Sequence, residues 1–309
     1  MAVSSSAAKG AVRTKRRLWD RIYPSFSILL PLLVIALFTI YPVLYAVRTS
    51  FFQYLLTKPK IHPFIGLKNY QEVVSNYYFT NSLTNTAVYT VAAVIGVLIF
   101  GLAVALLLNT KVLFSTPLRI VILLPWAIPA VVAGLMWKWL LNSDFGLVNG
   151  FLFGVGIIKD YIPFLASPTL AKFSLIMAYI WKEGPLVTIF FLAGLQLIPA
   201  ELYEAARIDG GGGWRLLRFI TLPLLRPIIL IVMVYETMTA ILVFDLIYVL
   251  TGGGPGDATA MISWFAYAEI FKFLNLGHGL ALAIIIALIT LFLILIYLRL
   301  LRTEEAVSQ

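Results

Sequence analysis

The stretch Thr86–Leu108, TAVYTVAAVIGVLIFGLAVALLL, decides the fold class, because it is apolar along its whole length and carries no charge. About 20 mainly apolar residues in a helix cross the roughly 30 Å of hydrocarbon in a bilayer. The rest of the chain is similar, with 61% hydrophobic and only 12% charged residues. A soluble domain carries about a quarter charged residues. The sequence therefore predicts an all-α integral membrane protein.

Six apolar stretches predict about six transmembrane helices. They are Phe26–Val47, Thr86–Leu108, Leu118–Leu141, Phe173–Leu197, Pro227–Leu250 and Leu280–Leu300. The first follows a basic segment, but its apolar run is too long for a signal peptide and no small-residue cleavage site follows. We expect an uncleaved first helix, a membrane domain over residues 26–300, and cytoplasmic tails at 1–25 and 301–309.

The distribution of basic residues predicts the orientation. With the N-terminus inside, the inner segments hold fourteen Lys and Arg residues and the outer segments hold seven. Cytoplasmic segments of membrane proteins carry such an excess. We therefore expect both termini in the cytoplasm, and we read the net charge of +9 as membrane topology. No basic cluster interleaved with aromatics on a polar surface indicates nucleic-acid binding.

The chain offers little for chemistry of its own. It has no cysteine, and His62 and His278 alone make no convincing metal site. The glycine runs at 210–213 and 252–256 are not followed by the Lys-Ser/Thr pair of a phosphate-binding loop. We expect no catalytic residue, no metal and no cofactor on this chain, and we set aside a membrane-embedded enzyme.

The most informative segment lies between the fourth and fifth stretches, where residues 198–210 read IPAELYEAARIDG. Pro199 suits the first position of a helix, and Glu201 lies in the first turn, where the helix dipole favours negative charge. Gly210 can adopt the left-handed conformation that ends a helix. The segment predicts a surface helix of about two to three turns on the cytoplasmic face. Residues 214–220 predict a second helix along the interface.

This segment resembles the EAA loop of permease subunits of bacterial ABC importers. The residues and spacing that agree are Glu204-Ala205-Ala206, Asp209-Gly210, Trp214 and Ile220-Thr221-Leu222-Pro223. Two positions depart from the family pattern, with Gly211 in place of alanine and Leu217 in place of an aromatic residue. In that family the loop, here residues 198–226, begins with a coupling helix that docks into the ATPase subunit. The resemblance implies coupling roles for Glu201, Glu204, Ala205, Ala206, Asp209, Gly210 and Gly211.

Other segments resemble the carbohydrate branch of that family, the maltose-transporter-like permeases. They are the FIGLKNY segment at 64–70, Leu124-Pro125 with Pro129, Trp181-Lys182 with Pro185, and the segment 244–255. The resemblance covers roughly residues 26–300 and implies a type I ABC importer permease fold in the bacterial inner membrane. It also implies that the solute is a di- or oligosaccharide, a polyol or a glycerol phosphate.

The resemblance further implies a set of partners. They are a second permease subunit, expected to differ from this one, two cytoplasmic ATPase subunits that bind ATP and Mg, and an extracellular solute-binding protein. ATPase closure would move the coupling helix, which would move the fourth and fifth spans as levers. This chain would bind no cofactor itself.

Charged and aromatic residues within the spans are candidates for the translocation pathway. A charge at the bilayer centre costs about 2.5 to 3.5 kcal/mol, so such residues usually face a protein interior or a watery path. The candidates are Trp181, Glu236, Thr239, Asp245 and Tyr248. On a straight helix, nine residues turn about 900°, so Glu236 and Asp245 would point to opposite faces. The alternative is that these carboxylates hold helices or a partner subunit together.

Prolines in two of the spans predict kinks or breaks, with Pro125 and Pro129 in the third and Pro185 in the fourth. A pathway beside these positions would be natural, because freed carbonyls are tolerated where they face a cavity. The main rival is an ion-coupled secondary transporter, which needs a carboxylate relay across the membrane. Glu236 and Asp245 on opposite faces fit such a relay poorly.

Overall fold

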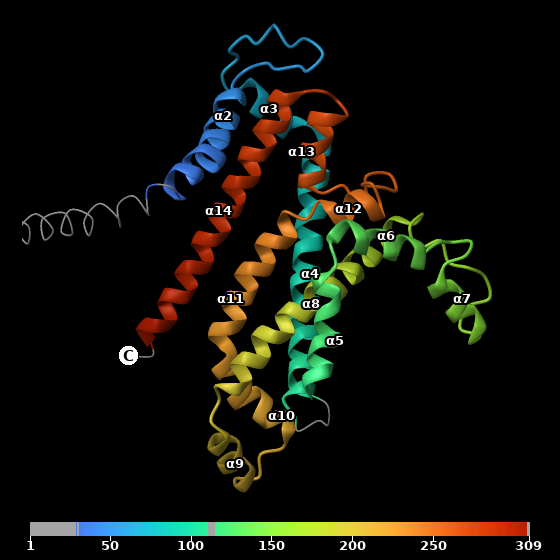
Figure 1. The fold of residues 1–309 in the computed structure, drawn as a ribbon, viewed down its shortest axis with the longest axis vertical. Helices are drawn as coiled ribbons and strands as arrows, with labels where there is room; N and C mark the ends of the chain where they lie inside the picture. Colours follow the sequence, from blue (N-terminus) through green and yellow to red (C-terminus); the bar gives the residue numbers. More distant parts are fainter. Residues whose placement is uncertain (1–28, 30, 111–114, 308–309) are drawn as a thin grey trace, which may run out of the picture.

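The computed structural model describes residues 29, 31–110 and 115–307, and within these ranges it contains helices, loops and isolated β-bridges but no strand (Figure 1). The N-terminal tail 1–25 lies outside the described residues. The helical elements in chain order are η1 (Ala36–Ile40), α2 (Tyr41–Thr49), α3 (Lys68–Ser75), α4 (Tyr77–Leu108), α5 (Ser115–Ala127), α6 (Ala130–Leu140), α7 (Leu147–Gly154), α8 (Pro168–Gln196), α9 (Ala200–Ile208), α10 (Gly213–Leu216), η2 (Leu217–Thr221), α11 (Leu222–Ile241), α12 (Asp245–Leu250), α13 (Ile262–Phe271) and α14 (Leu276–Val307).

Five helices of the described chain are long and apolar enough to cross a membrane, and a bent pair would make a sixth span. The five are Pro31–Thr49, Tyr77–Leu108, Pro168–Gln196, Gly213–Ile241 and Leu276–Tyr297, and the bent pair is Pro117–Ala127 with Ala130–Leu140. Each overlaps a stretch that hydropathy selected. The prediction of an all-α membrane protein with about six spans is confirmed.

The third span breaks beside its prolines as predicted, whereas the helix of the fourth span is continuous through its proline. Between α5 and α6 the chain bends by 93°, and Pro129 adopts the extended conformation that precedes α6. By contrast, α8 runs unbroken through Pro185, so of the two predicted outcomes, a kink or a break, the break does not occur there. Pro185 is buried in the bundle, and proline within a membrane helix is tolerated where neighbouring helices surround it.

The fifth span ends earlier than the apolar run predicts. Helix α11 stops at Ile241, and α12 starts afresh at Asp245, so the predicted end at Leu250 and the straight helix that would join Glu236 to Asp245 are wrong. The break leaves carbonyl groups without helical partners. Ser263 of α13 donates a 2.6 Å hydrogen bond to one of them, the carbonyl of Val243, and so stabilises a break that hydropathy does not register.

The bundle is centred on α4 and α8, which pack extensively against each other and cross obliquely in the view of Figure 1. Glycines allow the close approach. A Cβ on Gly101 would lie 2.6 Å from Cγ1 of Val187, and a Cβ on Gly184 would lie 2.4 Å from the Phe100 ring. Small residues at such positions are the usual means by which membrane helices pack closely. Helix α11 packs against both of these helices.

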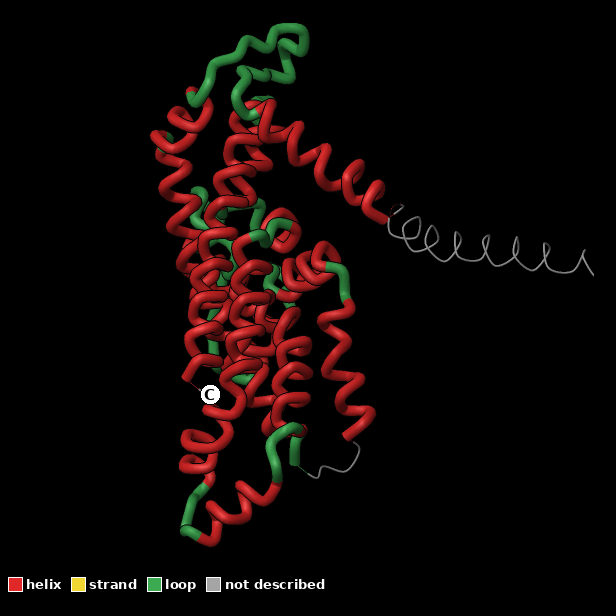
Figure 2. The backbone as a smooth tube through the Cα atoms, turned by 90° about the vertical axis from the view of Figure 1, so that its left-hand side faces the viewer, coloured by secondary structure: helices red, strands yellow, loops and turns green. Residues whose placement is uncertain are grey.

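The two ends of the bundle differ. Helix α9 and its loops lie at one end, and the loop between α2 and α3 lies at the other (Figures 1 and 2). At the latter end Asn69 donates hydrogen bonds to the carbonyls of Ser50 and Phe52. His278 lies between Glu72, at 3.0 Å, and Glu269, at 3.3 Å. These contacts fix the long loop onto the bundle.

Candidate functional site: the exposed helix α9 and a buried carboxylate cluster

The segment selected by the sequence forms the short helix α9. Pro199 precedes the helix in extended conformation, so it serves as the N-cap, one residue earlier than predicted. Glu201 lies in the first turn and Arg207 in the last, where each charge complements the helix dipole. Gly210 ends the helix with φ of +79° and donates a hydrogen bond to the carbonyl of Arg207. The predicted surface helix and its glycine cap are confirmed.

Helix α9 has an inner and an outer face. The Tyr203 hydroxyl lies 3.1 Å from Oγ1 of Thr221 and so faces the bundle. At 100° per residue, Glu201, Glu204, Ala205 and Ile208 share the opposite face. Ile208 is 86% exposed, and α9, whose residues are all described, buries none of them. The outer face of α9 therefore presents two glutamates and, at its C-terminal end, one highly exposed isoleucine.

The predicted coupling residues divide between these faces. Glu201, Glu204 and Ala205 lie on the outer face, and Asp209 is exposed at the helix end. Ala206 lies toward the inner face, where its carbonyl accepts a 2.8 Å hydrogen bond from the Gly211 amide. Ala206 and Gly211 therefore stabilise the turn that ends α9. The sequence analysis did not select Ile208. Its position on the outer face of α9 becomes apparent only from the angular positions of the residues around the helix axis.

A cluster of buried polar side chains lies between α4, α8 and α11. The Glu236 side chain is fully buried, and the Tyr179 hydroxyl donates a 2.9 Å hydrogen bond to its Oε2 atom. The Tyr89 ring meets that of Tyr179 edge to face at 5.6 Å. Nearby, Lys182 and the buried Glu183 form an ion pair of 2.8 Å. Sequence reading found Glu236 but missed its tyrosine partners.

This cluster is incompletely satisfied. Oε1 of Glu236, the Tyr89 hydroxyl and Oγ of Ser174 are buried without a hydrogen-bond partner among the described residues. A buried polar group without a partner is costly, by about 1 to 3 kcal/mol. Such groups in the middle of a membrane protein are rare unless they serve a ligand or a moving part.

Asp245 and Tyr248 belong to a different site at the far side of the helix break. Tyr248 lies in a cluster of aromatic rings, together with Phe244, Trp264, Tyr267 and Phe271, in which neighbouring ring centroids are 4.8 to 6.2 Å apart. We call this cluster the aromatic platform. The Lys272 ammonium lies 4.3 Å from the Trp264 ring centroid, and Asp245 is exposed at the start of α12.

The five predicted pathway residues therefore do not meet in one place. Trp181 packs edge to face on Trp137 of α6 at 5.9 Å. Thr239 donates a hydrogen bond to its own helix, at the carbonyl of Tyr235. Glu236 lies in the buried cluster, and the remaining two lie at the aromatic platform.

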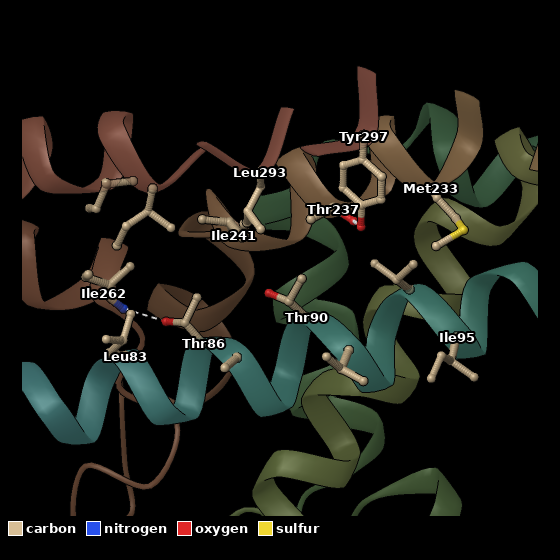
Figure 3. Close-up of a pocket in the computed structure, with 15 residues that line it drawn as sticks. Leu83, Thr86, Thr90, Ile95, Met233, Thr237, Ile241, Ile262, Leu293 and Tyr297 are labelled. Atoms are coloured by element: carbon tan, nitrogen blue, oxygen red, sulfur yellow. Dashed lines mark hydrogen bonds between the residues drawn. The ribbon is translucent and has the colours of Figure 1, made fainter. Parts of the chain in front are cut away.

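A further cavity of about 430 Å³ opens between α4, α11, α13 and α14, and contains none of the predicted pathway residues (Figure 3). Its walls are mostly apolar. Thr86 accepts a hydrogen bond from the Ile262 amide, and Thr237 bonds to Tyr297 at 3.0 Å. The described residues hold no group of three or more His, Cys, Asp or Glu side chains suited to a metal ion.

Long apolar helices around a buried polar cluster, with an exposed helix at one end, are the features of a helical integral membrane protein. Residues 97–303 match the family described as the binding-protein-dependent transport system inner membrane component, and this chain belongs to that family. Membership confirms the resemblance found in the loop at 198–226 and places the protein among multi-pass components of the inner membrane.

Relatives of known name cover most of the chain. It is 38% identical to the trehalose/maltose transport system permease protein MalF of Thermococcus litoralis, over 89% of this chain and 92% of the relative. It is 36% identical to the sulfoquinovosyl glycerol transport system permease protein SmoG of Agrobacterium fabrum, over 93% of each. A chain of a bacterial ABC transporter involved in the import of alginate shares the fold, with TM-score 0.78, 24% identity, and coverage of 93% of this chain and 99% of that one.

Proposed function

We propose that this chain is a permease subunit of an ATP-driven sugar importer and that α9 couples it to a cytoplasmic ATPase subunit. The observation that carries the proposal is the outer face of α9, where Glu201, Glu204, Ala205 and Ile208 are solvent-exposed at one end of the bundle. The names of the relatives, which transport trehalose, maltose or sulfoquinovosyl glycerol, support a sugar or sugar derivative as the solute.

The contacts around α9 suggest how motion reaches the membrane. Helix α9 lies between α8, which ends at Gln196, and the helix that begins at Gly213 and continues as α11. Tyr203 joins α9 to Thr221 just before α11. The same two flanking helices carry Tyr179 and Glu236, the hydrogen-bonded pair of the buried cluster. A displacement of α9 therefore acts on the helices that hold this pair, and alternating access would remake its contacts.

The proposed pathway has two positions that contact the sugar. The aromatic platform receives the sugar, because aromatic faces stack on the apolar face of a sugar ring, and Asp245 beside it accepts hydrogen bonds from hydroxyl groups. The buried cluster then offers the free oxygen of Glu236 deeper in the bundle. Trp181 and Thr239 remain proposed contacts of the solute, although Trp181 packs on Trp137 and Thr239 bonds to its own helix in this structure.

The other subunits of the transport complex are separate chains. A second, different permease subunit completes the pathway, two ATPase subunits bind ATP and Mg, and a solute-binding protein delivers the sugar at the end opposite α9. The α9 end and both termini, with tails at 1–25 and 301–309, then face the cytoplasm, as the excess of basic residues favours.

The test is ATPase activity of the complex, co-expressed from neighbouring genes and reconstituted in lipid, with candidate sugars and the binding protein. We expect sugar-dependent stimulation that Glu204→Lys abolishes and that Asp144→Lys, at an exposed carboxylate between α6 and α7, retains. The absence of a co-purifying ATPase, together with uptake driven by a proton or sodium gradient alone, would instead establish the secondary transporter.

A further inference from the structure

The helix that follows α9 exposes an aromatic and basic patch in its first two turns. Trp214 and Phe219 are 70% and 69% exposed, and Arg215 and Arg218 are exposed beside them. The guanidinium of Arg218 lies 5.9 Å from the centroid of the Phe219 ring. Residues three and four apart are neighbours on a helix surface, so these four side chains form one continuous patch.

The depth of the patch follows from the length of the helix. The same helix continues to Ile241 as a candidate span, and the 20 residues of Leu222–Ile241 are about 30 Å long, the thickness of the hydrocarbon. Residues 214–219 then lie about 5 to 12 Å beyond the hydrocarbon edge. This is the level of the lipid headgroups, where tryptophan and arginine anchor membrane proteins.

We propose that this patch binds the headgroups of anionic phospholipids. The structure pairs neither Arg215 nor Arg218 with a carboxylate of the described chain, so two positive charges remain for an external anion. The aromatic rings supply the interfacial contacts that such a headgroup site needs. The site rests on the proposed function in one respect, that this end of the bundle faces the negatively charged cytoplasmic leaflet.

A bound lipid would also act on coupling. The patch lies within about two helical turns before Thr221, and the Thr221 hydroxyl lies 3.1 Å from the Tyr203 hydroxyl of α9. An anionic headgroup that fixes Arg215 and Arg218 fixes the start of the α11 helix relative to the membrane. Movement of α9 by the ATPase is then transmitted to α11 and is not lost in motion of the intervening segment. Anionic lipid should therefore raise the sugar-stimulated ATPase activity.

The experiment places the complete complex in nanodiscs of phosphatidylcholine with or without phosphatidylglycerol. Native mass spectrometry counts retained phosphatidylglycerol, and ATPase activity is measured in parallel. We expect the double variant Arg215→Gln, Arg218→Gln to bind phosphatidylglycerol about fivefold more weakly per arginine removed. The matched control is Arg48→Gln, because the Arg48 guanidinium lies 5.6 Å from the Phe52 ring centroid at the opposite end, and it should keep both lipid binding and stimulation.

Three results would overturn the lipid site. They are equal retention of phosphatidylglycerol by the double variant, displacement of the lipid by inorganic phosphate at millimolar concentration, and loss of the ATPase subunit from the double variant in lipid-free detergent. The last would assign the patch to the ATPase interface. A wild-type complex that retains the lipid but shows no sugar-stimulated ATPase activity would refute the proposed function and leave the lipid site standing.

Discussion

Helix α9 and the buried cluster place carboxylates in opposite surroundings. Glu201 and Glu204 stand on an exposed helix, where water solvates each charge. Glu236 and Glu183 are buried between helices, where each needs a partner. Glu183 has Lys182 at 2.8 Å, whereas Glu236 has one tyrosine and a free oxygen. The difference is consistent with the proposal that α9 binds another molecule, whereas the carboxylates of the cluster need partners within this chain.

The largest effect is expected at the end of α9, with Gly210→Pro. Proline fixes φ near about −65°, whereas Gly210 has φ of +79° and an amide that bonds to Arg207. The turn cannot form, so we expect stimulated ATPase activity to fall to the basal rate while the spans still insert. Protease accessibility of the loop at 198–226 and ATPase assays on the same membranes measure both.

The control is Gly212→Ala, because Gly212 has φ of −77° and no atom lies within 4 Å of the position its Cβ would take. It should keep coupling. If Gly210→Pro couples as the wild type does, the docking role of α9 fails.

The next effect concerns the buried cluster. Glu236→Ala removes the acceptor of the Tyr179 hydroxyl and leaves a hole, which we expect to destabilise the protein by about 2 to 4 kcal/mol. Glu236→Gln keeps the volume and an acceptor, so the thermal midpoint should stay close to that of the wild type. Thermal unfolding in detergent, followed by tryptophan fluorescence, compares the two. Equal midpoints for both variants would show that the buried pair does not support the bundle.

These two regions also show what sequence could and could not predict. The α9 helix is encoded locally, by Glu201 in its first turn and Gly210 at its end, so its presence and its glycine cap could be predicted from the sequence, and its start was misplaced by one residue. The Tyr179–Glu236 hydrogen bond joins residues 57 positions apart. No periodicity within one helix relates them, and only packing of α8 on α11 brings them together.

The membrane spans also have some features that local sequence determines and others that neighbouring helices determine. Their existence follows from composition over about 20 residues, which is a local property. The end of α11 at Ile241 does not, because the break is stabilised by Ser263 of α13. The continuity of α8 through the buried Pro185 is likewise not apparent from the local sequence, in which a proline predicts a kink or a break. The helix end that depends on a neighbouring helix, at Ile241, was therefore misplaced, whereas the helix end that depends on a local glycine cap, at Gly210, was predicted.

A smaller effect tests the packing that holds the cluster in place. Gly184→Ala would place a Cβ 2.4 Å from the Phe100 ring, and we expect a loss of about 1 to 3 kcal/mol from overpacking. Gly154→Ala, at the end of α7, meets no atom within 4 Å and should leave the thermal midpoint unchanged. Equal thermal midpoints for Gly184→Ala and Gly154→Ala would show that α4 and α8 can move apart at Gly184 without loss of stability.

The smallest effect is expected where the two regions are linked. Tyr203→Phe removes the hydroxyl that lies 3.1 Å from Thr221, a bond worth about 0.5 to 1.5 kcal/mol. The ring keeps α9 in place, so folding and ATPase binding should persist. The ratio of sugar transported to ATP hydrolysed should nevertheless fall, because α9 then moves more freely relative to α11. Thr221→Val removes the same bond from the other side and should lower the ratio equally. If the double variant lowers it further than either single one, the two side chains act separately and the link between α9 and the buried cluster runs elsewhere.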